Sequence, residues 1–392
     1  MKAGSGLVPP GSENVWDHRD PGFRTLAELE AIAARRTMGH VWAYIEGGAG
    51  EERTLAANRA AFRRWVLRPR VLEDVSEIDL RTAILGNRTR APVFVSPTAY
   101  QGEVHPDAEV GTARALSAAG LLGTYSTLSS SSLEQIAAAS HGPAPWFQLY
   151  LQPDFAVSAS LARRAEKAGF SAIVLTADVP VLAVRDRQAE GGFAIDSSVP
   201  IGNGRDILPP SREPELQGEV YRLRSEASQT WDVLDRLRES TGLPLIVKGI
   251  LTAEDARRAV AHGARGILVS NHGGRQLDGA PASLDALAEV VAAVGNSAEV
   301  YLDGGVRRGS DVLIALALGA HAVGVGRPVL WALAAGGESG VRQYFALLTT
   351  ELATAMALVG RRRIAEIDRT LIGPAPGPAR LGERGPDRAD GP

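Results

Sequence analysis

The sequence predicts an α/β protein built as a (β/α)8 barrel, or TIM barrel, with an N-terminal helical extension and a long loop after the fourth strand. From residue 91 onward, eight short apolar or β-branched runs alternate with alanine-rich amphipathic segments over about 250 residues, the usual size of this barrel. Polar or charged residues stand at or directly after the ends of all eight runs. Glycine-rich stretches follow the seventh and eighth runs, where such barrels frequently bind phosphate. An open doubly wound sheet fits this alternation less well.

The strands and helices can be assigned from their spacing. The predicted strands are Pro92–Ser96, Leu121–Ser126, Trp146–Tyr150, Ala172–Thr176, Leu245–Lys248, Gly266–Ser270, Glu299–Asp303 and Ala322–Gly326. The helices predicted between them include Asp107–Ala119, Phe155–Ala168, Ala253–His262, Leu284–Val294 and Asp311–Leu318. Leu26–Arg36 and a short helix over His40–Ile45 form the N-terminal extension, which we expect to cap the barrel or its mouth.

Composition divides the chain into a core domain and two tails. Residues 1–22 are rich in Gly, Pro and Ser and predict a flexible tail, and residues 373–392 are proline-rich and charged and predict a disordered one. The barrel domain spans residues 23–372. Within it, residues 183–230 are polar and far too long for an ordinary strand-to-helix loop, so we expect a mobile loop over the active site.

The overall composition excludes several functions. Of the 392 residues 45% are hydrophobic, and the formal net charge of −3 gives no reason to expect a nucleic-acid partner. The absence of cysteine excludes disulfides, thiolate metal sites and a cysteine nucleophile, and fits a cytoplasmic location. No apolar run approaches the roughly 20 residues of a membrane span, so no membrane partner is expected. The histidines lack metal-ligand spacing, so no metal site is predicted.

The stretch Ser270–Asp278 carries the clearest catalytic signal. His272 and Arg275 emerge three residues apart just past the sixth predicted strand, among glycines. An imidazole can accept a proton near neutral pH, and a guanidinium can bind a carboxylate through two parallel hydrogen bonds. An isolated pair of this kind is more often an ordinary loop histidine and a surface arginine. Its place at a barrel strand end favours proton abstraction from an organic acid.

Other strand ends point to an anionic cofactor. Residues 303–309 and 324–328 are glycine-rich and contain Arg307 and Arg327, which suit a phosphate site after strands seven and eight. No Walker-type loop is present, and the glycines at 47–50 follow a helix, so neither ATP nor a Rossmann-bound nucleotide is indicated. Lys248 ends the fifth strand, where it would be either a Schiff-base nucleophile or a fixed positive charge beside a cofactor.

Several motifs together resemble the FMN-dependent (S)-2-hydroxy-acid oxidase and dehydrogenase family, which includes glycolate oxidase and lactate oxidase. They are Ser-Pro-Thr-Ala at 96–99, Trp-Phe-Gln-Leu-Tyr at 146–150, Leu-Thr-Ala-Asp-Val-Pro at 175–180, Val-Lys-Gly at 247–249, and the stretches 270–278 and 302–309. The resemblance runs from Leu26 to Ile372. Within the family, residues 99–101 and 126–130 are most similar to bacterial hydroxymandelate oxidases.

The resemblance implies a role for each matching residue. His272 would take the substrate's α-proton, or its hydroxyl proton if hydride passes directly to the flavin, and Asp178 would stabilise the protonated imidazole. Tyr150 would bind the α-hydroxyl, and Lys248 would stabilise the reduced flavin, which disfavours the Schiff base. The substrate carboxylate would contact Tyr44, Arg185 and Arg275. FMN would contact Pro97, Thr98, Ala99, Ser126, Gln148, Thr176, Lys248, Ser270, Asp303, Gly305, Arg307, Gly326 and Arg327.

Two positions depart from the family pattern. Leu128 replaces a tryptophan that plant glycolate oxidase has at its pocket wall, which predicts a bulky or aromatic, mandelate-like substrate rather than the smallest acids. Val184 replaces an arginine that is common in the family, next to the retained Arg185. The sequence therefore leaves open which basic side chain contacts the substrate or the flavin at this point.

The sequence therefore predicts an FMN enzyme that oxidises an (S)-2-hydroxy acid to a 2-keto acid and reduces oxygen to hydrogen peroxide. The resemblance also implies a homotetramer. The alternatives are a dehydrogenase that passes electrons to a quinone or another acceptor, and a lactate-type monooxygenase. An FMN isomerase and a non-catalytic binding protein are disfavoured because Tyr44, Tyr150, His272 and Arg275 are all present.

Overall fold

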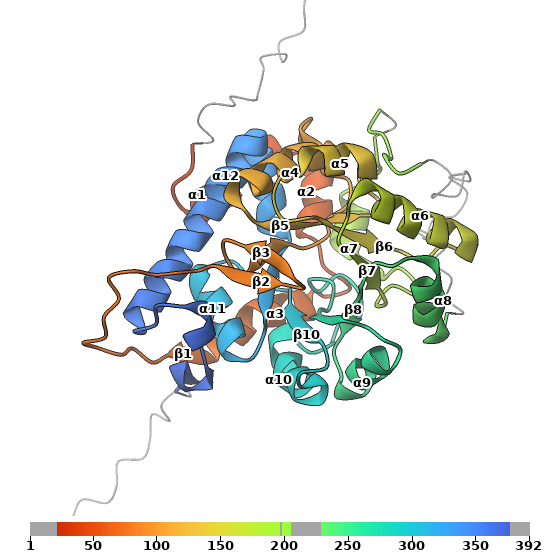
Figure 1. Ribbon diagram of the computed structural model, residues 1–392. Helices are drawn as coiled ribbons and strands as arrows, with labels where there is room; N and C mark the ends of the chain where they lie inside the picture. Colours follow the sequence, from red (N-terminus) through yellow and green to blue (C-terminus); the bar gives the residue numbers. More distant parts are fainter. Residues whose placement is uncertain (1–21, 197, 205–228, 377–392) are drawn as a thin grey trace, which may run out of the picture.

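The computed structural model describes residues 22–196, 198–204 and 229–376, and its centre is a closed barrel of eight parallel strands (Figure 1). The strands are β4 (Val93–Val95), β5 (Leu122–Ser126), β6 (Trp146–Leu149), β7 (Ala172–Thr176), β8 (Leu245–Ile250), β9 (Gly266–Val269), β10 (Glu299–Leu302) and β11 (Ala322–Val325). They close in chain order, with β11 paired to β4. The predicted (β/α)8 barrel is confirmed.

Side chains along each strand alternate between the inside of the barrel and the layer beneath the surrounding helices. Phe94, Trp146 and Tyr301 pack together inside it, because every second side chain of a strand points to the same face. The residues between them, such as Val95 and Ile173, belong to the larger core under the helices. Apolar side chains thus fill the described interior of the barrel, and the cavity described below opens at the carboxyl ends of the strands.

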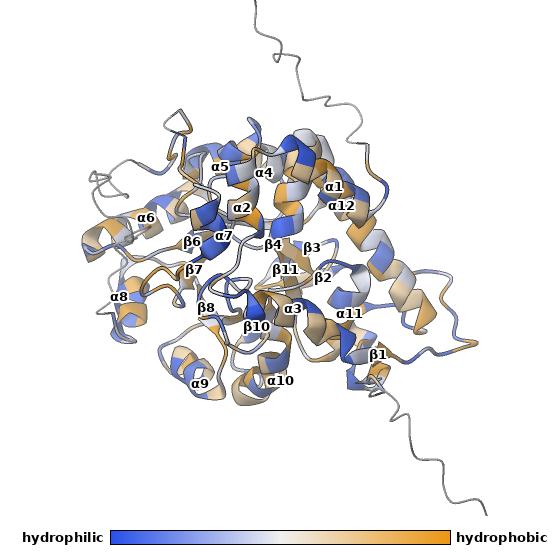
Figure 2. Cartoon of the chain, turned by 180° about the vertical axis from the view of Figure 1, so that it is seen from behind, coloured by the Kyte–Doolittle hydropathy of each residue, from blue (hydrophilic) through white to orange (hydrophobic). Residues whose placement is uncertain are grey.

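Helices surround the barrel, and each buries one apolar stripe. In α6 (Phe155–Ala168) the residues Leu161 and Ala165 are buried while Arg163 is exposed, and Figure 2 shows the same mixture of hydrophobic and hydrophilic residues along the outer helices. The other helices between strands are α4 (Ala108–Ala119), α5 (Leu133–Ala139), α8 (Asp232–Ser240), α9 (Ala253–Ala261), α10 (Ser283–Val294) and α11 (Gly309–Ala317).

The N-terminal region reaches both ends of the barrel. It contains α1 (Leu26–Arg36), α2 (Gly39–Glu46) and α3 (Arg53–Arg63), and α2 contributes Tyr44 and Ile45 to the cavity at the barrel mouth. The hairpin of β2 (Thr82–Ile84) and β3 (Asn87–Thr89) closes the opposite end, because Ile84 is fully buried in the interior cluster of the barrel. The helix α3 and this hairpin were not predicted.

The long segment after β7 is partly described. Residues 183–204, apart from 197, include α7 (Asp186–Glu190) and the buried Phe193 and Asn203, while residues 205–228 lie outside the described residues. The predicted tails likewise fall largely outside them, at residues 1–21 and 377–392. The mobility of these segments stays a prediction.

The C-terminal part wraps back onto the barrel. The helix α12 (Arg327–Leu358) begins directly after β11 and breaks at Gly336 and Gly337, where the backbone angles are not helical. A small sheet joins β1 (Trp65–Leu67) to β12 (Ile372–Pro374), and the short 3-10 turns are η1 (Gln101–Glu103), η3 (Ile364–Glu366) and η4 (Arg369–Leu371). Among the residues described, no helix is both long and apolar enough to span a bilayer.

Candidate active site

A cavity of about 120 Å³ opens at the carboxyl ends of the barrel strands. Fourteen of the residues predicted for the site line it: Tyr44, Pro97, Thr98, Ala99, Ser126, Tyr150, Lys248, His272, Arg275, Asp303, Gly305, Arg307, Gly326 and Arg327. The lining also includes Ile45, Ser96, Gly273, Gly304, Val306, Gly324 and Leu330, which were not singled out. Ser96 had a signal, since it ends a predicted strand, whereas Leu330 on α12 had none.

His272 is held by polar groups on both ring nitrogens. The chain turns just after β9, where His272 adopts a left-handed conformation with φ of 59°. Its Nδ1 lies 3.1 Å from Oδ1 of Asp178, and its Nε2 lies 3.4 Å from the hydroxyl of Tyr150. A carboxylate accepts only, so Nδ1 carries the proton and donates to Asp178. The lone pair of Nε2 therefore faces Tyr150 and is available as a base.

Lys248 completes this group from within β8, which extends past the predicted end at Lys248 to Ile250. Its Nζ lies 3.4 Å from Nδ1 of His272 and 3.9 Å from Oδ2 of Asp178. Burial lowers the pKa of His272, and the positive charge of Lys248 lowers it further against the opposing effect of Asp178. Burial alone would raise the pKa of Asp178, but Lys248 and His272 hold it below its ordinary value. The site thus holds a neutral imidazole beside an ionised carboxylate.

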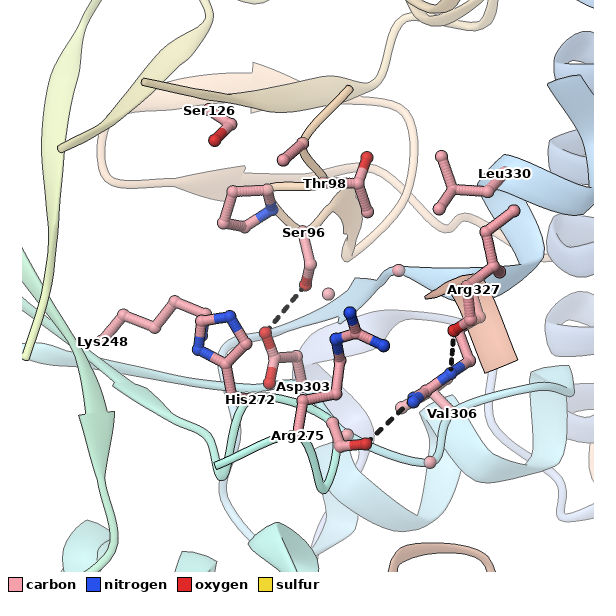
Figure 3. A pocket seen from close by; sticks show the side chains of 18 of the residues that line it. Ser96, Thr98, Ser126, Lys248, His272, Arg275, Asp303, Val306, Arg327 and Leu330 are labelled. Carbon is pink, nitrogen blue, oxygen red and sulfur yellow. Dashed lines mark hydrogen bonds between the residues drawn. The ribbon is translucent and has the colours of Figure 1, made fainter. Parts of the chain in front are cut away.

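Arg275 lines the same cavity, and in Figure 3 its guanidinium lies between His272 and Arg327. Its Nη1 donates to the backbone carbonyls of Tyr44 and Gly47 at 2.6 and 2.7 Å, and its guanidinium lies over the Tyr44 ring, 4.7 Å from the centroid. These contacts orient the guanidinium without neutralising it. A carboxylate in the cavity is the natural partner of such a cation.

Two further arginines carry unneutralised charge at the cavity. Arg327 donates to the carbonyls of Ile45 and Gly273 at 2.9 Å, and burial together with the nearby Arg275 lowers its pKa to about 9. Burial, and then the charge of Arg59, also lowers the pKa of Arg307. A pKa below the ordinary value means that the protein alone does not compensate these charges. An anionic group such as a phosphate would compensate them.

The remaining lining fits FMN, whose phosphate would meet Arg307 and Arg327. Asp303 accepts from the Ser96 hydroxyl at 3.0 Å through one carboxylate oxygen (Figure 3), while its other oxygen is buried without a described partner and suits a hydroxyl of the cofactor's polyol chain. A side chain at Gly305 would place its Cβ 2.4 Å from the carbonyl of Asn58. Only glycine allows the chain to pass this close, with its φ of 84°.

Three predicted flavin residues lie behind the lining. Gln148 accepts from the Ser126 hydroxyl at 3.0 Å and donates to the Thr176 hydroxyl at 2.9 Å, which ties together the ends of three neighbouring strands. The Ser270 hydroxyl accepts from the backbone N–H of His272 at 3.1 Å. Gln148, Thr176 and Ser270 are buried and hold lining residues in place.

Asp178, Arg185 and Leu128 also lie outside the lining. Asp178 acts on the cavity through its contact with His272. Arg185 donates to the carbonyl of Arg275 at 2.9 Å and to the side-chain oxygen of Gln276 at 3.2 Å. Leu128 is buried and is not among the residues that line the cavity, and its backbone carbonyl accepts from the N–H of Tyr100 at 3.0 Å. Their direct contacts with substrate stay predictions.

The fold and the site suit a barrel oxidoreductase of the flavoprotein class, because the buried Arg307 and Arg327 line one cavity with Arg275 and the neutral imidazole of His272. The sequence matches the family model described as FMN-dependent dehydrogenase over residues 33–374. The chain therefore belongs to this family and uses FMN. Within the residues described, no cluster of three or more His, Cys, Asp or Glu side chains is arranged to hold a metal ion.

Relatives with assigned names cover almost the whole chain. It is 45% identical to an L-lactate oxidase of Nostoc sp., with 88% of this chain and 97% of that protein covered. It is 47% identical to a 4-hydroxymandelate oxidase of Amycolatopsis orientalis, with 86% and 95% covered. The solved structure of a mandelate oxidase superposes with a TM-score of 0.83 at 44% identity, over 91% of this chain and 99% of that one.

Proposed function

We propose that the chain oxidises an (S)-2-hydroxy acid to the corresponding 2-keto acid with bound FMN as the electron acceptor, and that oxygen then takes the electrons and becomes hydrogen peroxide. The observation that carries this proposal is the neutral imidazole of His272 in one cavity with Arg275 and the hydroxyl of Tyr150. A 2-hydroxy acid offers a carboxylate, a hydroxyl and an α-proton in a matching arrangement.

Arg275 would bind the substrate carboxylate, and Tyr44 would contact the same group from α2. Tyr150 would bind the α-hydroxyl, which brings the reacting carbon within reach of Nε2 of His272. The pKa of Tyr150 is raised by burial and by the charge of Asp178, so this phenol stays protonated and can donate a hydrogen bond. The substrate would thus be held at two of its groups before it reacts.

The α-carbon loses its C–H bond, the hydroxyl loses its proton, and a C=O bond forms, so that two protons and two electrons leave the substrate. His272 would accept one of these protons. Bound FMN supplies the acceptor for the two electrons and the other proton. Asp178 stabilises the imidazolium, and Lys248 supplies a fixed positive charge for an anionic cofactor held at Arg307 and Arg327.

The substrate is proposed to be bulky or aromatic. The relatives named 4-hydroxymandelate oxidase and mandelate oxidase support an aryl group, and Leu128 lacks the indole that would make the wall bulkier. The relative named L-lactate oxidase keeps a small aliphatic acid as the second candidate. The tetrameric assembly and the cytoplasmic location also stay proposals, which light scattering and cell fractionation would test.

An anaerobic substrate screen tests the proposal. (S)-Mandelate, 4-hydroxymandelate, (S)-lactate and glycolate are each mixed with the holoenzyme while the flavin absorbance is followed, and (R)-mandelate is the matched control. The (S)-aryl acids should bleach the flavin fastest and (R)-mandelate should not. The reduced enzyme is then exposed either to air or, without air, to a quinone. The rate of flavin reoxidation is compared between the two, and peroxide is measured in the sample with air. If the flavin regains its colour only with the quinone, the chain is a dehydrogenase and the oxidase proposal fails.

A further inference from the structure

Two loops form one wall of the cavity, and they meet at a buried carboxylate. The loop after β4 supplies Thr98 and Ala99 to the cavity, and the end of β5 supplies Ser126. Glu109, in the first turn of α4, is fully buried between these loops and does not line the cavity.

Glu109 joins the loops through three backbone hydrogen bonds. Its Oε1 accepts from the N–H of Gln101 at 3.1 Å and from that of Ser130 at 3.0 Å, and its Oε2 accepts from the N–H of Ser131 at 3.0 Å. The first donor belongs to the loop after β4 and the other two to the loop after β5. Only an acceptor-only group with two oxygens can satisfy all three donors at once.

Short links lead from these donors to the cavity wall. The side chain of Gln101 donates to the Thr98 hydroxyl at 3.0 Å, and the Ser129 hydroxyl donates to the carbonyl of Ser126 at 2.7 Å. The loops also touch directly, because the N–H of Gly102 donates to the Ser130 hydroxyl at 2.9 Å. A Cβ at Gly102 would lie 2.8 Å from that hydroxyl, so a side chain at this position would disturb the contact.

We propose that Glu109 is a positioning residue that sets the spacing of the β4 and β5 loops and thereby the affinity and size selectivity of the cavity. Burial raises the pKa of Glu109, and its hydrogen bonds from the backbone N–H groups of Ser130, Gln101 and Ser131 oppose that rise. Its place in the first turn of α4 also favours negative charge. The expected effect on substrate binding rests on the proposed function, whereas the expected effect on FMN binding rests on the cavity alone.

Glu109→Gln is the direct test, because the amide keeps the size of the side chain but turns one acceptor into a donor facing a backbone N–H. The KM for (S)-mandelate and the Kd of FMN for the apoprotein should each rise about tenfold or more, the factor for losing one hydrogen bond to a charged group. The kcat should stay within about threefold, because the wall binds the ground state and the transition state alike. The preference for (S)-mandelate over (S)-lactate should fall, since the larger acid contacts more wall.

Glu166→Gln is the control. Glu166 also binds a loop through its carboxylate, accepting from the Thr241 hydroxyl at 2.7 Å and from the N–H of Gly242 at 3.2 Å, but this loop precedes β8 at the opposite end of the barrel. Its replacement should change KM, the FMN Kd and the substrate preference by no more than about twofold, as expected of an independent site.

A second variant covers the case in which Glu109→Gln does not fold. Ser130→Ala removes the hydroxyl that accepts from the N–H of Gly102 and leaves Glu109 intact. It should therefore raise KM and the FMN Kd and lower the preference for (S)-mandelate, each by a smaller factor than Glu109→Gln. If the soluble variants bind FMN as tightly as wild type and keep its substrate preference, the positioning role is refuted. If no hydroxy acid bleaches the wild-type flavin, the proposed function fails, and the FMN Kd still decides the inference.

Discussion

Replacing Asp178 by asparagine should slow flavin reduction without removing the flavin. In the wild type, Nδ1 of His272 lies 3.1 Å from the Asp178 carboxylate. The amide of asparagine has nearly the same shape and its oxygen can still accept from Nδ1, so the substitution removes only the charge. Two unit charges about 4 Å apart interact by about 4 kcal/mol in an effective dielectric of about 20. Each factor of ten in rate corresponds to about 1.4 kcal/mol of activation free energy. Losing the stabilisation of the imidazolium should therefore slow flavin reduction by up to about a thousandfold.

Lys248 makes this loss larger rather than smaller. Its ammonium lies 3.9 Å from Asp178, and in Asp178→Asn it would repel the imidazolium with no carboxylate to compensate. The assay is anaerobic stopped-flow bleaching at saturating (S)-mandelate, with FMN content measured on the same sample. Reduction at least about a hundredfold slower is expected. Reduction within about threefold of wild type would refute the role of Asp178 in stabilising the imidazolium.

Four further predictions follow from the same geometry. Arg327→Ala should weaken FMN binding by about tenfold or more, measured by fluorescence of the apoprotein, because a buried charge-assisted contact is lost. Arg275→Lys should raise KM by a similar factor, because an ammonium cannot form the bidentate contact. The kcat/KM should rise with pH through a pKa below 6.5, since His272 acts neutral and its pKa is lowered, and Lys248→Met should move this limb to higher pH. Leu128→Trp should shift preference from (S)-mandelate toward glycolate, and no such shift would exclude Leu128 as a determinant of substrate size.

The barrel could be predicted from sequence because each of its strands is a local pattern. Every predicted run overlaps an observed strand, and polar groups near the carboxyl ends of the strands, such as Lys248 within β8 and Asp303 just past β10, line the cavity. The local pattern also identified His272 and Arg275, since both follow a strand directly. Periodicity and the position of strand ends therefore indicate where the cavity opens, while the family resemblance implied other lining residues such as Tyr44 and Ala99.

Contacts between distant segments could not be read in the same way. Leu128, two residues past β5, is buried and lies outside the described lining of the cavity, and its contact with substrate stays a prediction. Glu109 looks like an ordinary polar residue of a helix, and its three donors lie 8 to 22 residues away. The hairpin that buries Ile84 carries too few apolar residues to stand out.

The most direct test of the proposed reaction is a single anaerobic turnover. Wild-type holoenzyme is mixed with one equivalent of (S)-mandelate. The amount of phenylglyoxylate formed is compared with the amount of flavin that bleaches. One keto acid per bleached FMN is expected, and His272→Ala, with the same FMN content, should bleach at least about a hundredfold more slowly. Bleaching of that variant at the wild-type rate, or bleaching without keto acid, would contradict the assignment of His272 as the base in oxidation of a 2-hydroxy acid.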